Sequence, residues 1–230
     1  PTDRIRALFE AADGAIWIGT DGDGLYRLDP HSGAVSHYQN DPNDSSTLSA
    51  DRVRSLHVDN KGSLWIGTYE TGLNRFIPES GRFQRYRHRP SDPRSVASSL
   101  VTAIVDDSAG NLWIGTDGGL SQWLGAADEF KNYRHEPTDH ASLIQDRIIS
   151  LFEDEGGVVW IGTYSGLNKW NPSTGHFTHF RHNASDEHSL SSNIVTSFAQ
   201  DTRGDIWIGT HGGGLNRRRS AQGQVEHYRK

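Results

Sequence analysis

The tetrapeptide Trp-Ile-Gly-Thr occurs five times in this 230-residue chain. Its tryptophans stand at nearly equal intervals of 47 or 48 residues: Trp17, Trp65, Trp113, Trp160 and Trp207. A period of roughly 20 to 50 residues is typical of repeat proteins, in which each unit is one small structural element that packs on its neighbours. The chain is therefore five copies of one unit, and the unit decides the fold.

The second unit shows what that element is. The apolar stretches Val53–Val58 and Leu64–Thr68 are separated by an Asp-Asn-Lys-Gly turn, which is a hairpin signal. The stretches Leu73–Ile77 and Phe83–Arg87 are separated by Pro-Glu-Ser-Gly. Four short antiparallel strands form one blade of a β-propeller.

The sequence thus predicts an all-β fold, a β-propeller of five four-stranded antiparallel blades that forms a single domain over residues 1–230. The blades are expected at about residues 1–47, 48–95, 96–142, 143–189 and 190–230. Val53 and Leu56 have opposite parity in the innermost strand, which suggests that both faces of each sheet are partly buried. A solenoid of stacked coils is the alternative architecture, and the hairpin turns disfavour it.

Charge and composition exclude several classes of function. The chain has 29 acidic and 23 basic residues, a net charge of -6, and basic residues spread along its length. A nucleic-acid surface needs a concentrated basic face, and the one basic cluster noted in the sequence, Arg217–Arg219, is short. No apolar run approaches the roughly 20 residues of a membrane span, so this segment is not expected to insert into a membrane. The absence of cysteine excludes disulfides and thiolate metal sites.

No residue pattern indicates catalysis, a metal or a cofactor. Many of the twelve histidines recur at equivalent positions of different units, which predicts structural or surface roles, and no helical His-x-x-x-His pattern occurs. An aspartate opens the first hairpin turn of four units, where it is expected to bond turn amides: Asp59, Asp107, Asp154 and Asp201. The first unit has Ala11 at that position. The chain is therefore predicted to be non-enzymatic.

A binding site is expected where the units differ from one another. In standard blade order, the loop between the second and third strands lies on the same face as the segment preceding the innermost strand. Variable residues on a rigid scaffold are where specificity resides. The predicted ligand site at this channel mouth comprises Asp21, Asp23, Arg52, Tyr69, Glu70, Asp117, Arg147, Tyr164 and His211. The alternative is that these residues are solvated loop tips with local Asp–Arg pairs.

The unit also resembles a known repeat. The pattern Asp-x-x-Gly-x-Leu-Trp-Ile-Gly-Thr, followed by Gly-Leu-Asn-Arg, is similar to the two-component regulator propeller repeat of bacterial sensor proteins, and it covers all five units. Unit 3 departs at 121–123 and unit 5 at 217–219. The resemblance implies the periplasmic or extracytoplasmic sensor region of a two-component or diguanylate cyclase signalling protein. Propellers of this family often have seven blades, so the five units are expected either to close a ring by face packing alone or to be a fragment of a larger ring.

The expected partner is a small molecule or a glycan, and self-association through unclosed blade edges is a further expectation. A five-bladed carbohydrate-binding lectin is one alternative. It would repeat the same pocket residues in every unit, whereas one equivalent position holds aspartate, tyrosine or histidine, as Asp21, Tyr69, Asp117, Tyr164 and His211. A second alternative is an enzyme similar to the streptogramin lyase propellers, which would need a metal-assisted cluster of histidine and acidic residues inside the ring.

Overall fold

The computed structural model describes residues 4–125, 127–220 and 223–228. Over these residues the chain forms twenty β-strands and no helix. The strands make five antiparallel sheets of four, each built from consecutive strands in chain order. The predicted fold class is confirmed, and the sheets are numbered here as blades 1 to 5 along the chain.

Equivalent strands of the five blades have nearly equal lengths. The innermost strands are β1 (Ile5–Glu10), β5 (Val53–Val58), β9 (Val101–Asp106), β13 (Ile148–Glu153) and β17 (Val195–Gln200). The second strands, which carry the repeated tetrapeptide, are β2 (Ile16–Thr20), β6 (Leu64–Thr68), β10 (Leu112–Thr116), β14 (Val159–Thr163) and β18 (Ile206–Thr210). The third strands are β3 (Leu25–Leu28), β7 (Leu73–Ile77), β11 (Gly119–Leu124), β15 (Leu167–Asn171) and β19 (Gly214–Arg218). The outermost strands are β4 (Val35–Tyr38), β8 (Arg82–Tyr86), β12 (Glu129–Tyr133), β16 (His176–Phe180) and β20 (Val225–Tyr228).

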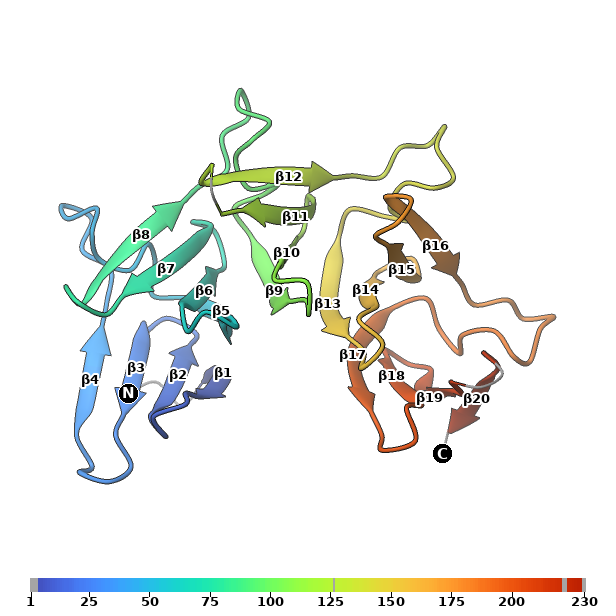
Figure 1. Ribbon diagram of the computed structural model, residues 1–230, viewed down its shortest axis with the longest axis horizontal. Helices are drawn as coiled ribbons and strands as arrows, with labels where there is room; N and C mark the ends of the chain where they lie inside the picture. Colours follow the sequence, from blue (N-terminus) through green and yellow to red (C-terminus); the bar gives the residue numbers. More distant parts are fainter. Residues whose placement is uncertain (1–3, 126, 221–222, 229–230) are drawn as a thin grey trace.

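The blades stand in chain order around a shared centre, with their innermost strands on the concave side (Figure 1). Each innermost strand contacts the innermost strand of the next blade, from β1 through β5, β9 and β13 to β17. Blades 1 and 5 lie at the two ends of an open arc (Figure 1). The five units therefore have propeller packing without a closed ring.

Each seam between blades is filled by the tryptophan of one blade and aliphatic residues of the next. Between blades 2 and 3, Trp65 and Leu73 pack with Val101 and Ile114, and all four side chains are fully buried. The same positions fill the other three seams, where the tryptophans are Trp17, Trp113 and Trp160. The tryptophans of blades 1 to 4 are thus buried against the next blade in the chain. Each of these blades therefore needs the following blade to complete its core.

The glycine of the repeated tetrapeptide lets neighbouring blades approach closely near the centre. A Cβ atom built on Gly115 would lie 2.7 Å from Cγ2 of Ile148 in the next blade. The equivalent atom on Gly67 would lie 2.6 Å from Cγ1 of Val101. Both distances are shorter than carbon atoms tolerate, so any side chain at these positions would push the blades apart.

A bulge in the innermost strand corrects the interpretation of strand parity. In blade 2, Val53 pairs with Thr68 but Ser55 pairs with Gly67, so the pairing skips one residue of β5. The skip places Val53 and Leu56 on one face, where both pack against blade 1. Opposite parity was therefore the wrong reason for expecting two buried faces. The second buried face comes from the tryptophan on β6, which packs against blade 3.

The turn aspartates have the predicted role and a second one. Oδ1 of Asp107 accepts the backbone N–H of Asn111 at 2.8 Å, which confirms the turn bond. Oδ2 accepts the indole N–H of Trp113, also at 2.8 Å. The same indole bond occurs in blades 2, 4 and 5, and Ala11 leaves blade 1 without it.

Histidines hold the connectors between blades, as predicted for structural roles. Nδ1 of His88 lies 2.8 Å from the carbonyl oxygen of Val96, eight residues later. His135 and His182 make the same contact with Leu143 and Leu190. Each accepting residue is almost completely buried, so the histidine fixes the connector over the seam.

The two end blades expose the faces that are buried at every internal seam. In blade 1, Ile5 is 55% exposed, whereas the equivalent Val53 of blade 2 is 1% exposed. In blade 5, Leu215 is 38% exposed, whereas the equivalent Leu167 of blade 4 is 1% exposed. Blade 1 therefore exposes the face that carries the aliphatic residues of a seam, and blade 5 exposes the face that carries the tryptophan.

Candidate functional site

The structure places the two predicted loop segments side by side in every blade. The backbone N–H after the tetrapeptide donates to the carbonyl of the residue preceding the innermost strand. The bonds are Asp21 to Arg4, Tyr69 to Arg52, Asp117 to Leu100, Tyr164 to Arg147 and His211 to Ile194, with N···O distances from 2.9 to 3.4 Å. The channel mouth is defined here by these five pairs of segments.

Asp21 is the most enclosed carboxylate of the channel mouth. Its side chain is 11% exposed and accepts hydrogen bonds from Nη2 of Arg6 at 2.6 Å and Nε of Arg52 at 3.1 Å. These hydrogen bonds, that of Arg6 first, lower the pKa of Asp21. Because Arg52 belongs to blade 2, the carboxylate ties the first two blades together. The predicted residues Asp21 and Arg52 thus meet as an ion pair.

Asp23 lies on the same loop as Asp21 but faces the rim of blade 1. Its carboxylate accepts a hydrogen bond from the hydroxyl of Tyr26, which raises the pKa of that tyrosine to about 12. The ring of Tyr26 stacks on His37, with centroids 4.0 Å apart. Asp23 therefore organises the side of its own blade and is not brought to Asp21.

Two arginine–tyrosine stacks occupy the channel mouth. The guanidinium carbon of Arg52 lies 4.0 Å from the ring centroid of Tyr69, and that of Arg147 lies 4.4 Å from the ring of Tyr164. Such contacts contribute about 0.5–1 kcal/mol at exposed sites. Each stack joins the two segments of one blade, and Tyr164 remains 43% exposed. The stacks are present in blades 2 and 4, which alternate with blades that lack them.

The remaining predicted residues are separate from these pairs. Glu70, Asp117 and His211 are exposed at the loops of blades 2, 3 and 5. None of the nine predicted residues lines any of the five pockets found among the described residues. The structure therefore gathers the predicted site pairwise, as Asp21 with Arg52 and Tyr69, and as Arg147 with Tyr164, without one enclosing hollow.

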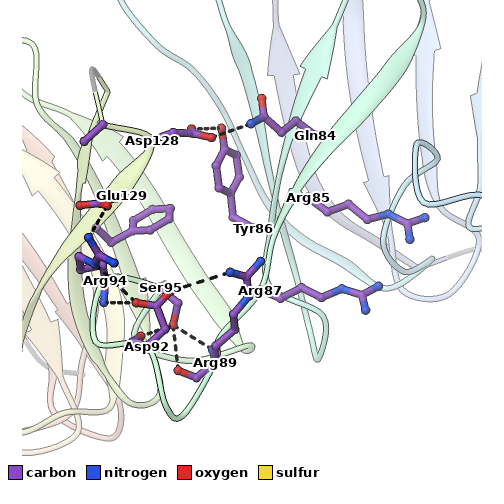
Figure 2. Close-up of a pocket in the computed structure, with 12 residues that line it drawn as sticks. Gln84, Arg85, Tyr86, Arg87, Arg89, Asp92, Arg94, Ser95, Asp128 and Glu129 are labelled. Carbon is purple, nitrogen blue, oxygen red and sulfur yellow. Dashed lines mark hydrogen bonds and ion pairs between the residues drawn. The ribbon is translucent and has the colours of Figure 1, made fainter.

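A pocket of about 370 Å³ lies instead on the rim between blades 2 and 3, and Figure 2 shows its lining. The hydroxyl of Tyr86 donates to Asp128 of blade 3 at 2.7 Å, and Nη1 of Arg94 lies 2.8 Å from Glu129. Burial first, and then this bond, raise the pKa of Tyr86. Asp128 reaches across from a left-handed backbone conformation with φ 55°. The pocket thus lies at the seam between blades 2 and 3, where a hydrogen bond and an ion pair connect its two sides.

The sequence interpretation missed the basic run that borders this pocket. Five arginines lie within thirteen residues, at Arg82, Arg85, Arg87, Arg89 and Arg94. This run is a larger basic cluster than Arg217–Arg219. Arg85 has a structural role, since its guanidinium donates hydrogen bonds to the backbone carbonyls of Asp44, Thr47 and Leu48. Counting charges along the outermost strands would have revealed the cluster.

The described residues contain neither a metal-binding cluster nor a membrane-spanning helix. No group of three or more histidine, aspartate or glutamate side chains is arranged to hold a metal ion within that part of the chain. The same residues contain no helix long and apolar enough to cross a membrane.

Comparison with known proteins decides the family. The profile of the two component regulator propeller matches the chain five times, over residues 1–22, 47–70, 95–118, 142–165 and 189–212, together just over half of its length. The chain belongs to the two component regulator propeller family. The repeat resemblance seen in the sequence is thereby confirmed. None of the curated proteins in the comparison matches the chain.

Solved structures similar to this family member include the extracellular domain of BT4673 from B. thetaiotaomicron, described as a one component or hybrid two component system. The identity is 26% and the TM-score 0.76, over 99% of this chain and 31% of that one. The extracellular domain of BT3049 from the same organism matches at 20% identity and a TM-score of 0.59, over 94% and 40% of the two chains. The present chain thus spans about a third of the length of these sensor domains.

Virginiamycin B lyase from Staphylococcus aureus has a similar fold. The TM-score is 0.70 at 12% identity, over 98% of this chain and 70% of the lyase. At this identity the likeness shows the propeller fold alone. The fold is thus shared by extracellular domains of signalling proteins and by an enzyme, so fold alone assigns no function.

Proposed function

We propose that the chain is part of an extracytoplasmic sensor propeller of a signalling protein, that it is non-enzymatic, and that it binds a ligand at the channel mouth. Its family and its likeness to extracellular domains of proteins described as two component systems support this proposal. The ligand is a small molecule or a glycan, and the signalling output lies elsewhere in the full protein.

The observation that carries the proposal is the pair of stacks in blades 2 and 4. Arg147 on Tyr164 and Arg52 on Tyr69 present flat surfaces that combine a cation with an aromatic ring. Such surfaces suit sugar rings and planar anions, because stacking and hydrogen bonding act together. Among the described residues, two of the five blades carry such an arginine–tyrosine stack, which favours one asymmetric site over the five equal pockets of a lectin.

A thermal-shift screen with monosaccharides, disaccharides and small organic acids tests the proposal. A ligand that binds only the folded state raises the melting temperature in a saturable way. We expect Arg147→Ala and Tyr164→Ala to weaken that binding about tenfold or more, since they remove one stack. The absence of any ligand whose saturable shift is weakened by Arg147→Ala or Tyr164→Ala would refute a ligand site at the channel mouth.

Lys131→Ala is the matched control. Lys131 lies 4.9 Å from the ring of Tyr133 on the rim of blade 3, so it forms a cation–aromatic pair away from the channel mouth. We expect this variant to bind every ligand as the unmodified chain does. Equal weakening by Lys131→Ala would show that the substitutions act through general stability.

A further inference from the structure

Arg218 occupies a position that is aromatic in the three preceding blades. Phe76, Trp123 and Trp170 stand at this point of the third strand, and each packs edge-on against the tryptophan of the preceding blade, at centroid distances of 5.2, 4.8 and 5.5 Å. In blade 5 the guanidinium carbon of Arg218 lies 5.2 Å from the ring of Trp160 instead. A cation thus replaces an aromatic ring in the seam between blades 4 and 5.

In the part of the chain that the structure describes, this cation lies against aromatic rings, but its Nε has no hydrogen-bond acceptor. Nε of Arg218 is buried and makes no hydrogen bond, and the side chain forms no ion pair there. Its sequence neighbours differ, since Nε of Arg217 donates to Asp205 at 2.9 Å and Nε of Arg219 donates to Glu226 at 2.7 Å. A buried charged donor without an acceptor costs free energy, so its presence needs an explanation.

The same side chain lines a pocket of about 230 Å³ at this seam. The apolar part of the lining comprises Leu167, Phe180, Leu190, Ile208 and Val225, of which all but Phe180 are almost completely buried. The guanidinium carbon of Arg218 also lies 5.8 Å from the Phe180 ring. The lining therefore combines these apolar side chains with the cation of Arg218, and its polar members also include His179, Arg181, Asp186, His188 and Ser189.

Arg218 is one of the residues that line the pocket, and Gly223 lies beside its guanidinium. Gly223 borders the pocket, and a Cβ atom built on it would lie 3.2 Å from Nη2 of Arg218, on the side that also carries the Nε hydrogen. The pocket's acidic residue, Asp186, is occupied by a turn bond from the backbone N–H of His188 at 3.0 Å. Burial lowers the pKa of Arg218, the expected result for a cation without a bound anion.

We propose that this pocket binds a small organic anion, a carboxylate or similar oxyanion carried on an apolar or aromatic body, with Arg218 as its anchor. The planar guanidinium of Arg218 carries a fork of N–H donors that matches the two oxygens of a carboxylate. The apolar side chains of the lining receive the body of the ligand. The cavity is smaller than the roughly 300–1,000 Å³ of most ligand sites, which restricts the ligand to a single small ring or a short chain.

Calorimetric titration with phenylacetate, phenylacetamide and inorganic phosphate tests this proposal. We expect saturable binding of phenylacetate, and binding at least about tenfold weaker for the neutral amide and for phosphate. Phosphate binding equal to that of phenylacetate would overturn the role of the apolar side chains. Equal binding of the amide, or no binding of phenylacetate, would overturn the anion site.

Three variants locate the site. Arg218→Phe introduces the residue of blade 2, so the chain should fold at least as stably while phenylacetate binding falls about tenfold or more. Arg218→Lys keeps the charge but not the fork and should weaken binding to an intermediate degree. Arg219→Gln, which changes an arginine outside the pocket, should leave binding unchanged. Undiminished binding by Arg218→Phe would refute the proposal. No residue of the channel mouth lines this pocket, so this test and that of the proposed function fail independently.

Discussion

The carboxylate of Asp107 accepts the indole N–H of Trp113 at 2.8 Å while it holds the hairpin turn between β9 and β10. The tryptophan ring reaches across the seam into blade 4, where it packs with Ile148 and Ile161. One side chain thus couples a turn, a strand and the next blade. This coupling explains why aspartate and tryptophan recur together, six residues apart, in four of the five units.

Asp107→Ala should destabilise the domain by about 1–3 kcal/mol. The substitution leaves the indole N–H of Trp113 buried without an acceptor and removes the bond to the turn amide. Chemical denaturation monitored by tryptophan fluorescence measures the loss. An unchanged midpoint would show that the indole bond adds nothing to stability.

Blade 1 offers the reciprocal test, because Ala11 stands where the other blades have aspartate. Ala11→Asp should provide an acceptor for Trp17 and raise the free energy of unfolding by about 1 kcal/mol. A decrease in stability would mean that the turn of blade 1 differs from the others in a way that excludes the carboxylate.

Gly115→Ala should destabilise the chain by about 1–3 kcal/mol, because the new methyl group would collide with Ile148 across the seam. Gly209 is the matched control at the open end of the arc. The three atoms nearest to a Cβ atom there are Oγ and Cβ of Ser197 and Oγ1 of Thr196, all within its own blade, and the Ser197 hydroxyl can rotate. Equal losses for both variants, measured by thermal denaturation, would contradict the packing argument.

Stability should fall in acid through Asp201. Burial opposes ionisation of this carboxyl, but hydrogen bonds from the Trp207 indole and from the backbone of Arg203 and Asp205 outweigh it and lower the pKa to about 2. The ordinary value is 3.8, so the unfolded chain binds more protons between about pH 4 and pH 2. The stabilisation is complete above that window and is lost as the pH falls through it.

Asp201→Asn should flatten the dependence of unfolding free energy on pH between about pH 4 and pH 2, as measured by urea denaturation at a series of pH values. The exposed Asp117 provides the control, because Asp117→Asn removes a carboxylate that makes no such bonds. A pH profile that Asp201→Asn leaves unchanged would show that other carboxyls carry the acid sensitivity.

The uncovered end faces should make the 230-residue chain associate with a second copy of itself. Leu215 at one end and Leu8 at the other are 38% and 62% exposed, at positions that pack against a neighbouring blade within the arc. Light scattering over a range of concentrations should show mass increasing above that of one chain, and Leu215→Lys or Leu8→Lys should reduce it.

Leu124 serves as the control for this prediction. It is 40% exposed at the end of β11 in blade 3, away from both end faces. Leu124→Lys should leave association unchanged. A monomer at every concentration, or an equal effect of Leu124→Lys, would contradict self-association through the end faces.

The repeat allowed most of the fold to be predicted. In blade 2, three of the four strands begin and end at the predicted residues, and β8 is shifted by one, because turns and apolar stretches mark these bounds directly. The bulge after Val53 could not be predicted, since it arises from strand pairing and leaves no local signal. The role of Asn74 was equally hidden. This buried amide accepts the N–H of Ser49 in the connector at 2.9 Å.

The candidate site was predicted less completely. Position within the repeat was enough to place Asp21 beside Arg52 and Arg147 beside Tyr164. The position of a residue within the repeat gave no information on pockets, because a pocket depends on how the side chains of two blades pack at the rim. Arg218 was visible in the sequence only as a departure from the repeat. The missing acceptor of its Nε and its pocket could be recognised only from the structure.

The sharing of each seam between two blades has a consequence for how such chains arise. At each of the four seams one blade contributes an indole and the next blade receives it, so neighbouring units present matching surfaces. Gene duplication or deletion of a whole unit therefore preserves the chemistry at the junction, whereas loss of half a unit destroys it. Blade number can drift by single steps during evolution while the outer polar residues diversify independently.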